Sequence, residues 1–192
     1  MRRAQQISML PTFSGTPKKG SRKIMRALST RLPVHMILKS SRAKGALAFS
    51  NVSRKIDVLL GHTARRFAVK IEQHSVNCNH VHLLIRIPSR QAYVAFARTL
   101  SSGIVRLLQS RVCEKLTHFF PETICTRVLT WGKDLRQMSD YIEQNQREAL
   151  GIFSTTKHRS AHFLCPSIDV HRCSQPSFTP KMQRGAQASG LL

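Results

Sequence analysis

Acidic residues are scarce in this sequence. The 192 residues include 9 aspartates and glutamates against 31 lysines and arginines, which gives a formal net charge of +22. No acidic residue precedes Asp57. An imbalance of this size exceeds what solubility favours, and it indicates a polyanionic partner, above all a nucleic acid.

Long apolar runs are also missing. No stretch approaches the roughly 18 consecutive apolar residues that a membrane span requires, and the N-terminus has no apolar core of the secretory type. We therefore expect a soluble protein without a membrane partner, in the bacterial cytoplasm and associated with the nucleoid. The five cysteines form an odd, widely spaced set without any Cys-x-x-Cys pair, which argues against a disulfide framework.

Composition divides the chain into three parts. Residues 1–30 combine basic and small polar residues with proline and glycine, so we expect a flexible basic arm. Residues 31–153 have the apolar periodicity of one folded domain. Residues 154–192 contain several prolines and glycines without clear periodicity, which predicts a basic, disordered tail. The tail does contain His158 and His162 at zinc-ligand spacing, but the pattern matches no common zinc module.

The apolar pattern inside residues 31–153 predicts seven elements. Short runs rich in apolar and β-branched residues indicate strands, and apolar residues at intervals of three and four indicate helices. We predict strands over 34–39, 70–76, 80–87 and 125–129, and helices over 53–69, 91–112 and 134–150. The order βαββαβα fits an α+β, ferredoxin-like fold, in which a four-stranded antiparallel sheet carries its helices on one face.

His80 and His82 are the first candidate functional residues. Alternate side chains of a strand point to the same face, so both imidazoles project from one side while Val81 points to the other. Two imidazoles on a rigid strand make a chelating pair for a divalent metal, to which one further ligand would add. The alternative is a pair of solvated histidines on an exposed sheet face.

Tyr141 and Asn145 are the second candidate pair. Their spacing of four residues places both side chains on one face of the last predicted helix, so a nucleophile and a ligand could share that face. The alternative is that Tyr141 is a core tyrosine beside Ile142. Glu72 and His74, on the strand next to the histidine strand, are further candidates for touching the metal or orienting a ligand.

Two segments in this order resemble the single-tyrosine HUH transposases, and most closely their REP-associated branch. These segments are Asn79-His80-Val81-His82-Leu83-Leu84-Ile85 and Tyr141-Ile142-Glu143-Gln144-Asn145. The resemblance extends over about residues 31–151. It implies an HUH endonuclease-like active site on the ferredoxin-like sheet, with the histidine strand and the tyrosine helix side by side.

The resemblance also implies a chemistry. His80 and His82 would bind Mg²⁺ or Mn²⁺, and Tyr141 would attack a phosphate of single-stranded or hairpin DNA to form a covalent 5′-phosphotyrosine link. The family's third metal ligand lies one turn after the tyrosine and is usually glutamine or histidine. This chain has Asn145 there, and Gln144 is a less favoured candidate.

The basic residues predict where DNA is bound, and two other functions remain open. Phosphate contacts are expected from Arg22, Lys23, Arg42, Lys44, Arg65, Arg66 and Arg106. A catalytically weak or inactive HUH-derived nucleic-acid-binding protein would share these residues, and so would a ribosome-associated basic RNA-binding protein. The sequence is compatible with a monomer and with a homodimer.

Overall fold

The computed structural model describes residues 12–13 and 26–152. Its helices and strands, in chain order, are β1 (Thr12–Phe13), β2 (Val34–Lys39), the short 3₁₀ helices η1 (Gly45–Leu47) and η2 (Phe49–Val52), α1 (Ser53–Arg66), β3 (Lys70–Val76), β4 (His80–Arg86), α2 (Arg90–Gln109), β5 (Cys125–Val128) and α3 (Lys133–Ala149).

The strands form one antiparallel sheet in the order β1-β5-β2-β4-β3. The four longer strands are the predicted ones, and the predicted order of strands and helices is confirmed. The structure differs within the segment expected to be a flexible arm, because Thr12–Phe13 pair with β5 as an additional edge strand. The predicted boundaries of the arm and the tail remain predictions.

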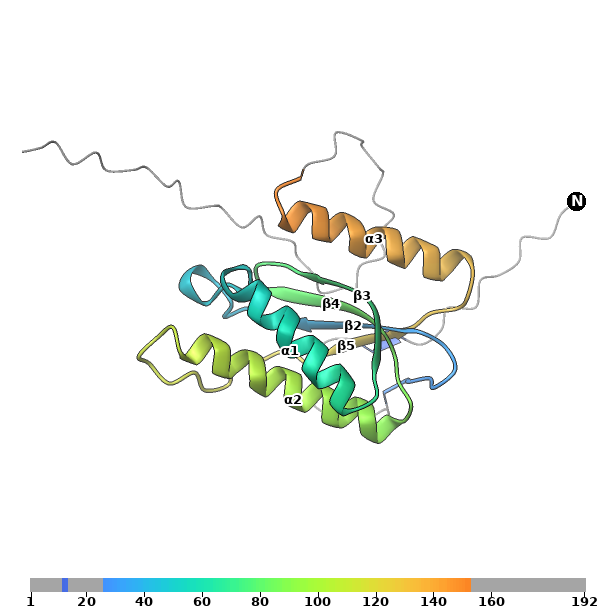
Figure 1. Ribbon diagram of the computed structural model, residues 1–192, viewed down its shortest axis with the longest axis horizontal. Helices are drawn as coiled ribbons and strands as arrows, with labels where there is room; N and C mark the ends of the chain where they lie inside the picture. The colour runs from blue at the N-terminus through green and yellow to red at the C-terminus, as the bar shows by residue number, and fades with distance from the viewer. Residues whose placement is uncertain (1–11, 14–25, 153–192) are drawn as a thin grey trace, which may run out of the picture.

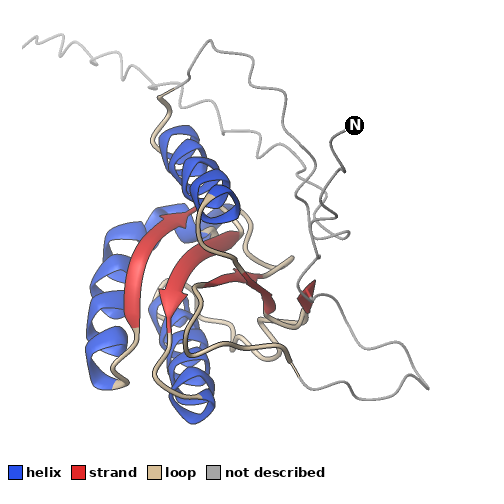
Figure 2. Cartoon of the chain, turned by 90° about the vertical axis from the view of Figure 1, so that its right-hand side faces the viewer, coloured by secondary structure: helices blue, strands red, loops and turns tan. Residues whose placement is uncertain are grey.

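Helices cover both faces of the sheet. Helices α1 and α2 pack side by side on one face, and α3 lies across the other, as Figure 1 shows from one side and Figure 2 after a quarter turn. The α+β, ferredoxin-like plan is thus present in the sheet with α1 and α2. The expectation that all helices share one face is wrong for α3, and the reason is its apolar stripe, which packs on a separate cluster of residues.

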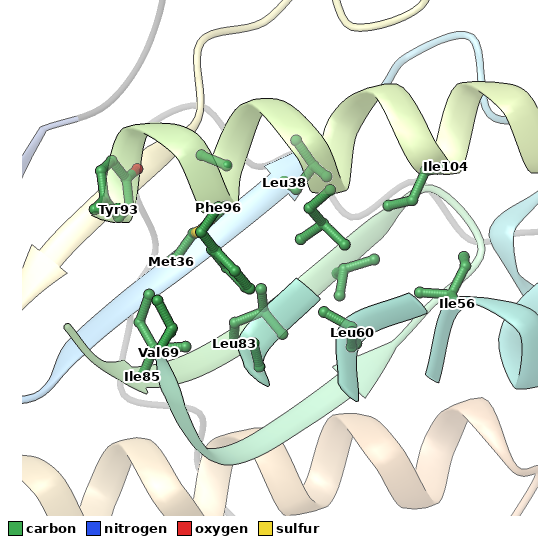
Figure 3. Close-up of a cluster of buried hydrophobic side chains, with 14 of the residues drawn as sticks. Met36, Leu38, Ile56, Leu60, Val69, Leu83, Ile85, Tyr93, Phe96 and Ile104 are labelled. Carbon is green, nitrogen blue, oxygen red and sulfur yellow. The ribbon is translucent and has the colours of Figure 1, made fainter. Parts of the chain in front are cut away.

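The main core lies between the sheet and the helices α1 and α2 (Figure 3). The side chains of β2 and β4 alternate between the two faces of the sheet. Those that point into this layer are at most 1% exposed and include Met36 and Leu38 of β2 and Leu83 and Ile85 of β4. Ser89 precedes α2 and caps it, because its side chain accepts a hydrogen bond from the backbone N–H of Ala92. Helix α1 follows η2 directly, with Ser53 as its first residue.

A smaller core attaches α3 to the opposite face. It consists of Leu84 from β4, Leu129 from the β5–α3 connection, and Met138 and Ile142 from α3. The hydroxyl of Ser139 also donates a hydrogen bond of 2.8 Å to Oε1 of Gln73 on β3. Helix α3 is therefore held over β3 and β4 of its own chain, and this fixes the face that Tyr141 presents to the sheet.

Ile142→Ala tests the small core. Ile142 is fully buried, so truncation removes apolar contacts and leaves a cavity, and we expect the free energy of unfolding to fall by about 3 kcal/mol. Chemical denaturation followed by circular dichroism measures this change. Val58→Ala is the control, since Val58 is 63% exposed and its truncation should change stability little. Equal stability of both variants would contradict the packing of α3.

Candidate metal and nucleophile site

The candidate site lies where β4 faces α3. In β4, Val81, Leu83 and Ile85 point into the main core, so His80 and His82 point to the side of α3. The ring centroids of the two histidines are 4.7 Å apart, with the rings perpendicular. The sequence prediction that both imidazoles share one face therefore agrees with the observed strand.

A third histidine joins them from the neighbouring strand. His35 of β2 is 5% exposed, and its Nε2 lies 3.0 Å from Nδ1 of His82. The two rings are stacked, with centroids 5.2 Å apart and planes 6° from parallel. Because Nδ1 of His82 has this partner, the other ring nitrogen, Nε2, is the one left for another interaction. It is buried and has no hydrogen-bond partner.

His80 is oriented by two asparagines of the β3–β4 turn. Its Nδ1 lies 2.7 Å from Oδ1 of Asn79, and its Nε2 lies 2.9 Å from Nδ2 of Asn77. A carboxamide oxygen can only accept, so Nδ1 carries the proton of the neutral ring and Nε2 presents a lone pair. Ser75 donates to Oδ1 of Asn77 at 3.5 Å, which agrees with the orientation of that side chain.

Asn145 of α3 reaches the same point. Its Oδ1 accepts a hydrogen bond of 3.5 Å from Nδ2 of Asn77, the atom that also contacts His80. Lone pairs of His80 and Asn145 thus converge on one electropositive group. The side-chain amide nitrogen of Asn145, Nδ2, donates a hydrogen bond of 2.8 Å to the backbone carbonyl of Tyr141, one turn earlier in the helix.

Burial keeps the three imidazoles neutral. Desolvation, with a smaller effect of the positive charge of Arg127, lowers the pKa of His35 from 6.5 to about 3. Desolvation and the nearby Lys39 lower the pKa of His80 to about 4, and burial holds the pKa of His82 well below its ordinary value. Neutral imidazoles have the lone pairs that a metal ion requires.

Tyr141 lies against the histidines. Its ring meets that of His82 edge to face, with centroids 5.4 Å apart. Burial raises the pKa of Tyr141 above 10, the hydrogen bond from Asn145 opposes this, and the charge of Glu148 adds to it. The phenol is therefore protonated at neutral pH, and its use as a nucleophile requires a nearby positive charge or a proton acceptor.

The other sequence candidates lie away from this point. Gln144 is exposed and donates to Glu148, so its side chain is directed along the outer surface of α3. His74 contacts Asp57 of α1, on the far side of the sheet, whereas Glu72 pairs with Lys70 and Arg86. Glu72 and His74 point to opposite faces of the sheet although they are two residues apart, because the register of β3 shifts between residues 71 and 73.

The residues at this point offer three donor atoms to a divalent metal only if the amide oxygen of Asn145 is one of them, beside His80 and His82. Within residues 26–152 no group of three histidine, cysteine, aspartate or glutamate side chains is arranged to hold an ion. The fit rests on the unpaired, buried Nε2 of His82 and on the convergence of His80 and Asn145 toward one point. Two imidazoles and one amide oxygen are a suitable set for Mn²⁺ or Mg²⁺.

The predicted DNA-binding residues are dispersed. Arg22 and Lys23 lie outside the described residues. Arg42 and Lys44 are exposed in the loop after β2, near the His80 end of the sheet. Arg65 and Arg66 are exposed at the end of α1, and Arg106 is exposed on α2, so these three lie in the layer opposite α3.

The candidates named from the sequence include neither His35 nor Asn77. A signal for His35 was available, because a histidine inside an apolar strand next to the histidine strand lies on one of only two faces. The face, however, depends on the register between β2 and β4, where Ile37 is opposite His82 and His35 is opposite Leu84. That register cannot be read from either strand alone.

The family described as Transposase IS200 like matches residues 29–145 of the chain. No curated protein matches the chain in sequence.

Among solved structures, a Deinococcus radiodurans R1 protein described as a transposase is 21% identical, with a TM-score of 0.42, and the match covers 65% of this chain and 98% of that one. A REP-associated tyrosine transposase bound to a REP hairpin is 13% identical, with a TM-score of 0.56, and the match covers 69% of this chain and 76% of that one. The second similarity supports the fold.

No helix in the described part of the chain is long and apolar enough to span a bilayer. The family match includes β2, the histidine strand β4 and most of α3 up to Asn145, which are the segments that build the candidate site. Since it extends over more than half of the sequence, the chain belongs to the family of IS200-like transposases.

Proposed function

We propose that this chain is a metal-dependent endonuclease and strand transferase for single-stranded or hairpin DNA, with Tyr141 as the nucleophile. The observation that carries the proposal is the buried, unpartnered Nε2 of His82, with His80 beside it and the ring of Tyr141 against it. Leaving a buried polar atom without a partner costs about 1–3 kcal/mol, so its retention favours a functional role.

His35 supports this role by fixing the tautomer of His82. When Nδ1 of His82 donates its proton to Nε2 of His35, the lone pair of His82 is at Nε2, the unpartnered atom. A metal-binding histidine is commonly oriented in this way through its second nitrogen. His35 is thus a positioning residue, and His80 and His82 are the proposed ligands.

Asn145 is the proposed third ligand. Its amide oxygen and Nε2 of His80 both face Nδ2 of Asn77, so a rotation of the Asn77 side chain would leave both lone pairs directed at one point. A divalent ion bound there would withdraw charge from the oxygens of the scissile phosphate and lower the pKa of a nearby phenol. Mn²⁺ suits the two nitrogen ligands, and Mg²⁺ is the alternative.

Tyr141 supplies the covalent step. Its phenolic oxygen forms a bond to phosphorus while the bond from phosphorus to the 3′ oxygen breaks, and the phenolic proton passes to solvent. The 5′ phosphate end of the downstream fragment is then linked to Tyr141, and the 3′ oxygen of the upstream fragment takes up a proton from solvent to become a 3′ hydroxyl. Attack of a 3′ hydroxyl on the phosphotyrosine reverses the step and rejoins or transfers the strand.

The same geometry supports a proposal for the substrate and for the assembly. A phosphate reaches Tyr141 in line only on a flexible strand, which favours single-stranded DNA or the foot of a hairpin. The structural neighbour bound to a REP hairpin supports a place for this chain in the REP-associated branch and a hairpin as its substrate. Because α3 packs on its own sheet, the proposed ligands and nucleophile all come from one chain, so a monomer suffices for the chemistry.

Tyr141→Phe tests the nucleophile. We expect the unmodified chain to form a covalent adduct with single-stranded DNA from the flanks of its own gene when Mn²⁺ is present, and Tyr141→Phe to form none, because only the phenolic oxygen is removed. The adduct is detected by its slower migration on a denaturing gel.

Tyr93→Phe is the matched control, since Tyr93 is buried in the main core and should not affect the adduct. An adduct that persists in Tyr141→Phe contradicts the proposal. DNA binding without any adduct in the unmodified chain would instead support an inactive nucleic-acid-binding protein.

His35→Phe tests the positioning role. Phenylalanine keeps a flat ring beside His82 but cannot accept its proton, so we expect about tenfold weaker binding of Mn²⁺. Isothermal titration calorimetry measures this without DNA. His35→Gln, whose amide oxygen can accept the proton, should restore part of the affinity, and His62→Gln, on the exposed side of α1, should change nothing. Unaltered Mn²⁺ binding by His35→Phe would refute the role.

The buried imidazoles also predict acid lability of the metal-free protein. The folded pKa of His35, about 3, lies below the ordinary value of 6.5, so the unfolded chain binds more protons at acid pH. The contribution of neutral His35 to the free energy of unfolding is fully present above pH 6.5 and is lost as the pH drops toward 3. For His35 we expect a loss of about 2 kcal/mol between pH 7 and pH 5.

Urea denaturation in the presence of a chelator, repeated at each pH, gives the slope of the free energy of unfolding against pH. The slope should decrease in His35→Phe and stay the same in His62→Gln. A free energy of unfolding that is constant from pH 7 to pH 5 would show that the imidazoles are not held neutral by burial.

A further inference from the structure

We propose that Trp131 and the guanidinium of Arg86 form a stacking platform for one unpaired nucleobase of the bound DNA strand. Trp131 is the only tryptophan of the chain, and its side chain is 52% exposed. The inference rests on the proposed function in one respect, that the partner is single-stranded DNA.

Trp131 is exposed, but its backbone is fixed. It lies in the connection between β5 and α3, next to Gly132, whose φ of 90° is a conformation that glycine adopts without strain. On one side Leu129 is fully buried and its N–H donates to the carbonyl of Pro33. On the other side the carboxylate of Asp134 accepts from the backbone N–H of Thr130. The indole is therefore presented by a rigid turn.

One face of the indole is already occupied by a cation. The guanidinium of Arg86 lies 5.5 Å from the ring centroid and is held in place by a hydrogen bond of 2.6 Å to Glu72. Burial raises the pKa of Glu72, but the hydrogen bonds from Arg86 and Lys70 outweigh it and hold the pKa below its ordinary value. The carboxylate thus stays charged and keeps Arg86 in place against the ring.

The platform lies on the same face as the candidate site. His82 and Arg86 are both even-numbered residues of β4, so both point toward α3, about 13 Å apart along the strand. Tyr141 lies eight residues after the first residue of α3, which corresponds to about 12 Å along the helix axis, and Trp131 lies two residues before that start. A DNA strand whose phosphate lies at Tyr141 could therefore place a base on Trp131 a few nucleotides away.

The chemistry of the platform favours a base over other partners. Every nucleobase has a π face that stacks on an aromatic ring without regard to sequence, and arginine adds a cation–π contribution. The charged neighbours Lys70, Arg86 and Lys133 attract a polyanion, whereas the two nearby carboxylates, Glu72 and Asp134, are each paired with an arginine. An acidic or apolar protein surface is the competing partner, since exposed tryptophan is also common in protein interfaces.

The emission of Trp131 provides a direct test in the full-length chain, because no other tryptophan contributes. We expect a thymidine oligonucleotide to quench the emission, and an abasic oligonucleotide of equal length and equal phosphate number to leave it nearly unchanged. Equal quenching by both would show that phosphates alone are sensed, and this would overturn the platform.

Variants give the second measurement. By fluorescence anisotropy of labelled DNA we expect Trp131→Ala to bind about tenfold more weakly and Trp131→Phe to be intermediate, in line with the loss of one stacked base. The dependence on salt should be unchanged in both, since no phosphate contact is removed. Val58→Ala, which truncates another exposed apolar side chain, is the matched control.

The remaining outcomes are also decisive. Circular dichroism excludes misfolding of Trp131→Ala, and Trp131→Phe retains a ring if that variant is unstable. Unaltered DNA affinity of both variants, or dissociation of an oligomer by Trp131→Ala in sedimentation, would overturn the inference. Quenching that persists in Tyr141→Phe, or in a chain that forms no adduct, supports the platform even where the proposed cleavage fails.

Discussion

The alternation of β4 between two buried faces is the constraint on which the rest of the structure depends. Val81, Leu83 and Ile85 fill the main core, and this forces the even-numbered residues to the side of α3. The same register places His82 within reach of His35 on β2. A shift of the register of β4 by one residue would move both histidines into the apolar core and remove Leu84 from its contact with α3.

Much of this fold could be predicted from local patterns. The β3–β4 hairpin and the long helix α2 have periodicities that depend only on residues close in sequence. Three features could not be predicted, because each depends on a partner far along the chain. The face covered by α3 depends on Leu84 and Leu129, the contact of His35 depends on the register of β2, and the shifted register near Glu72 separates it from His74.

In the candidate site, too, the relations between residues close in sequence could be predicted, and those between distant segments could not. Two histidines on one strand face and Tyr141 one turn before Asn145 are local relations, and the structure brings them together. Asn77 could be recognised as a turn residue, but not as the group on which His80 and Asn145 converge. That role appears only when the turn and α3 are packed on each other.

The charge of the proposed metal ligands determines how strongly a bound cation would attract the phosphate of the substrate. Two neutral imidazoles and one amide carry no negative charge, so they would leave the full charge of a divalent ion available to a phosphate. Carboxylate ligands would neutralise much of it. Helix α3 itself carries four acidic residues, Asp134, Asp140, Glu143 and Glu148, against three basic ones, and offers a polyanion no net attraction. Productive binding of a phosphate at Tyr141 would therefore be coupled to binding of the cation, each raising the affinity for the other.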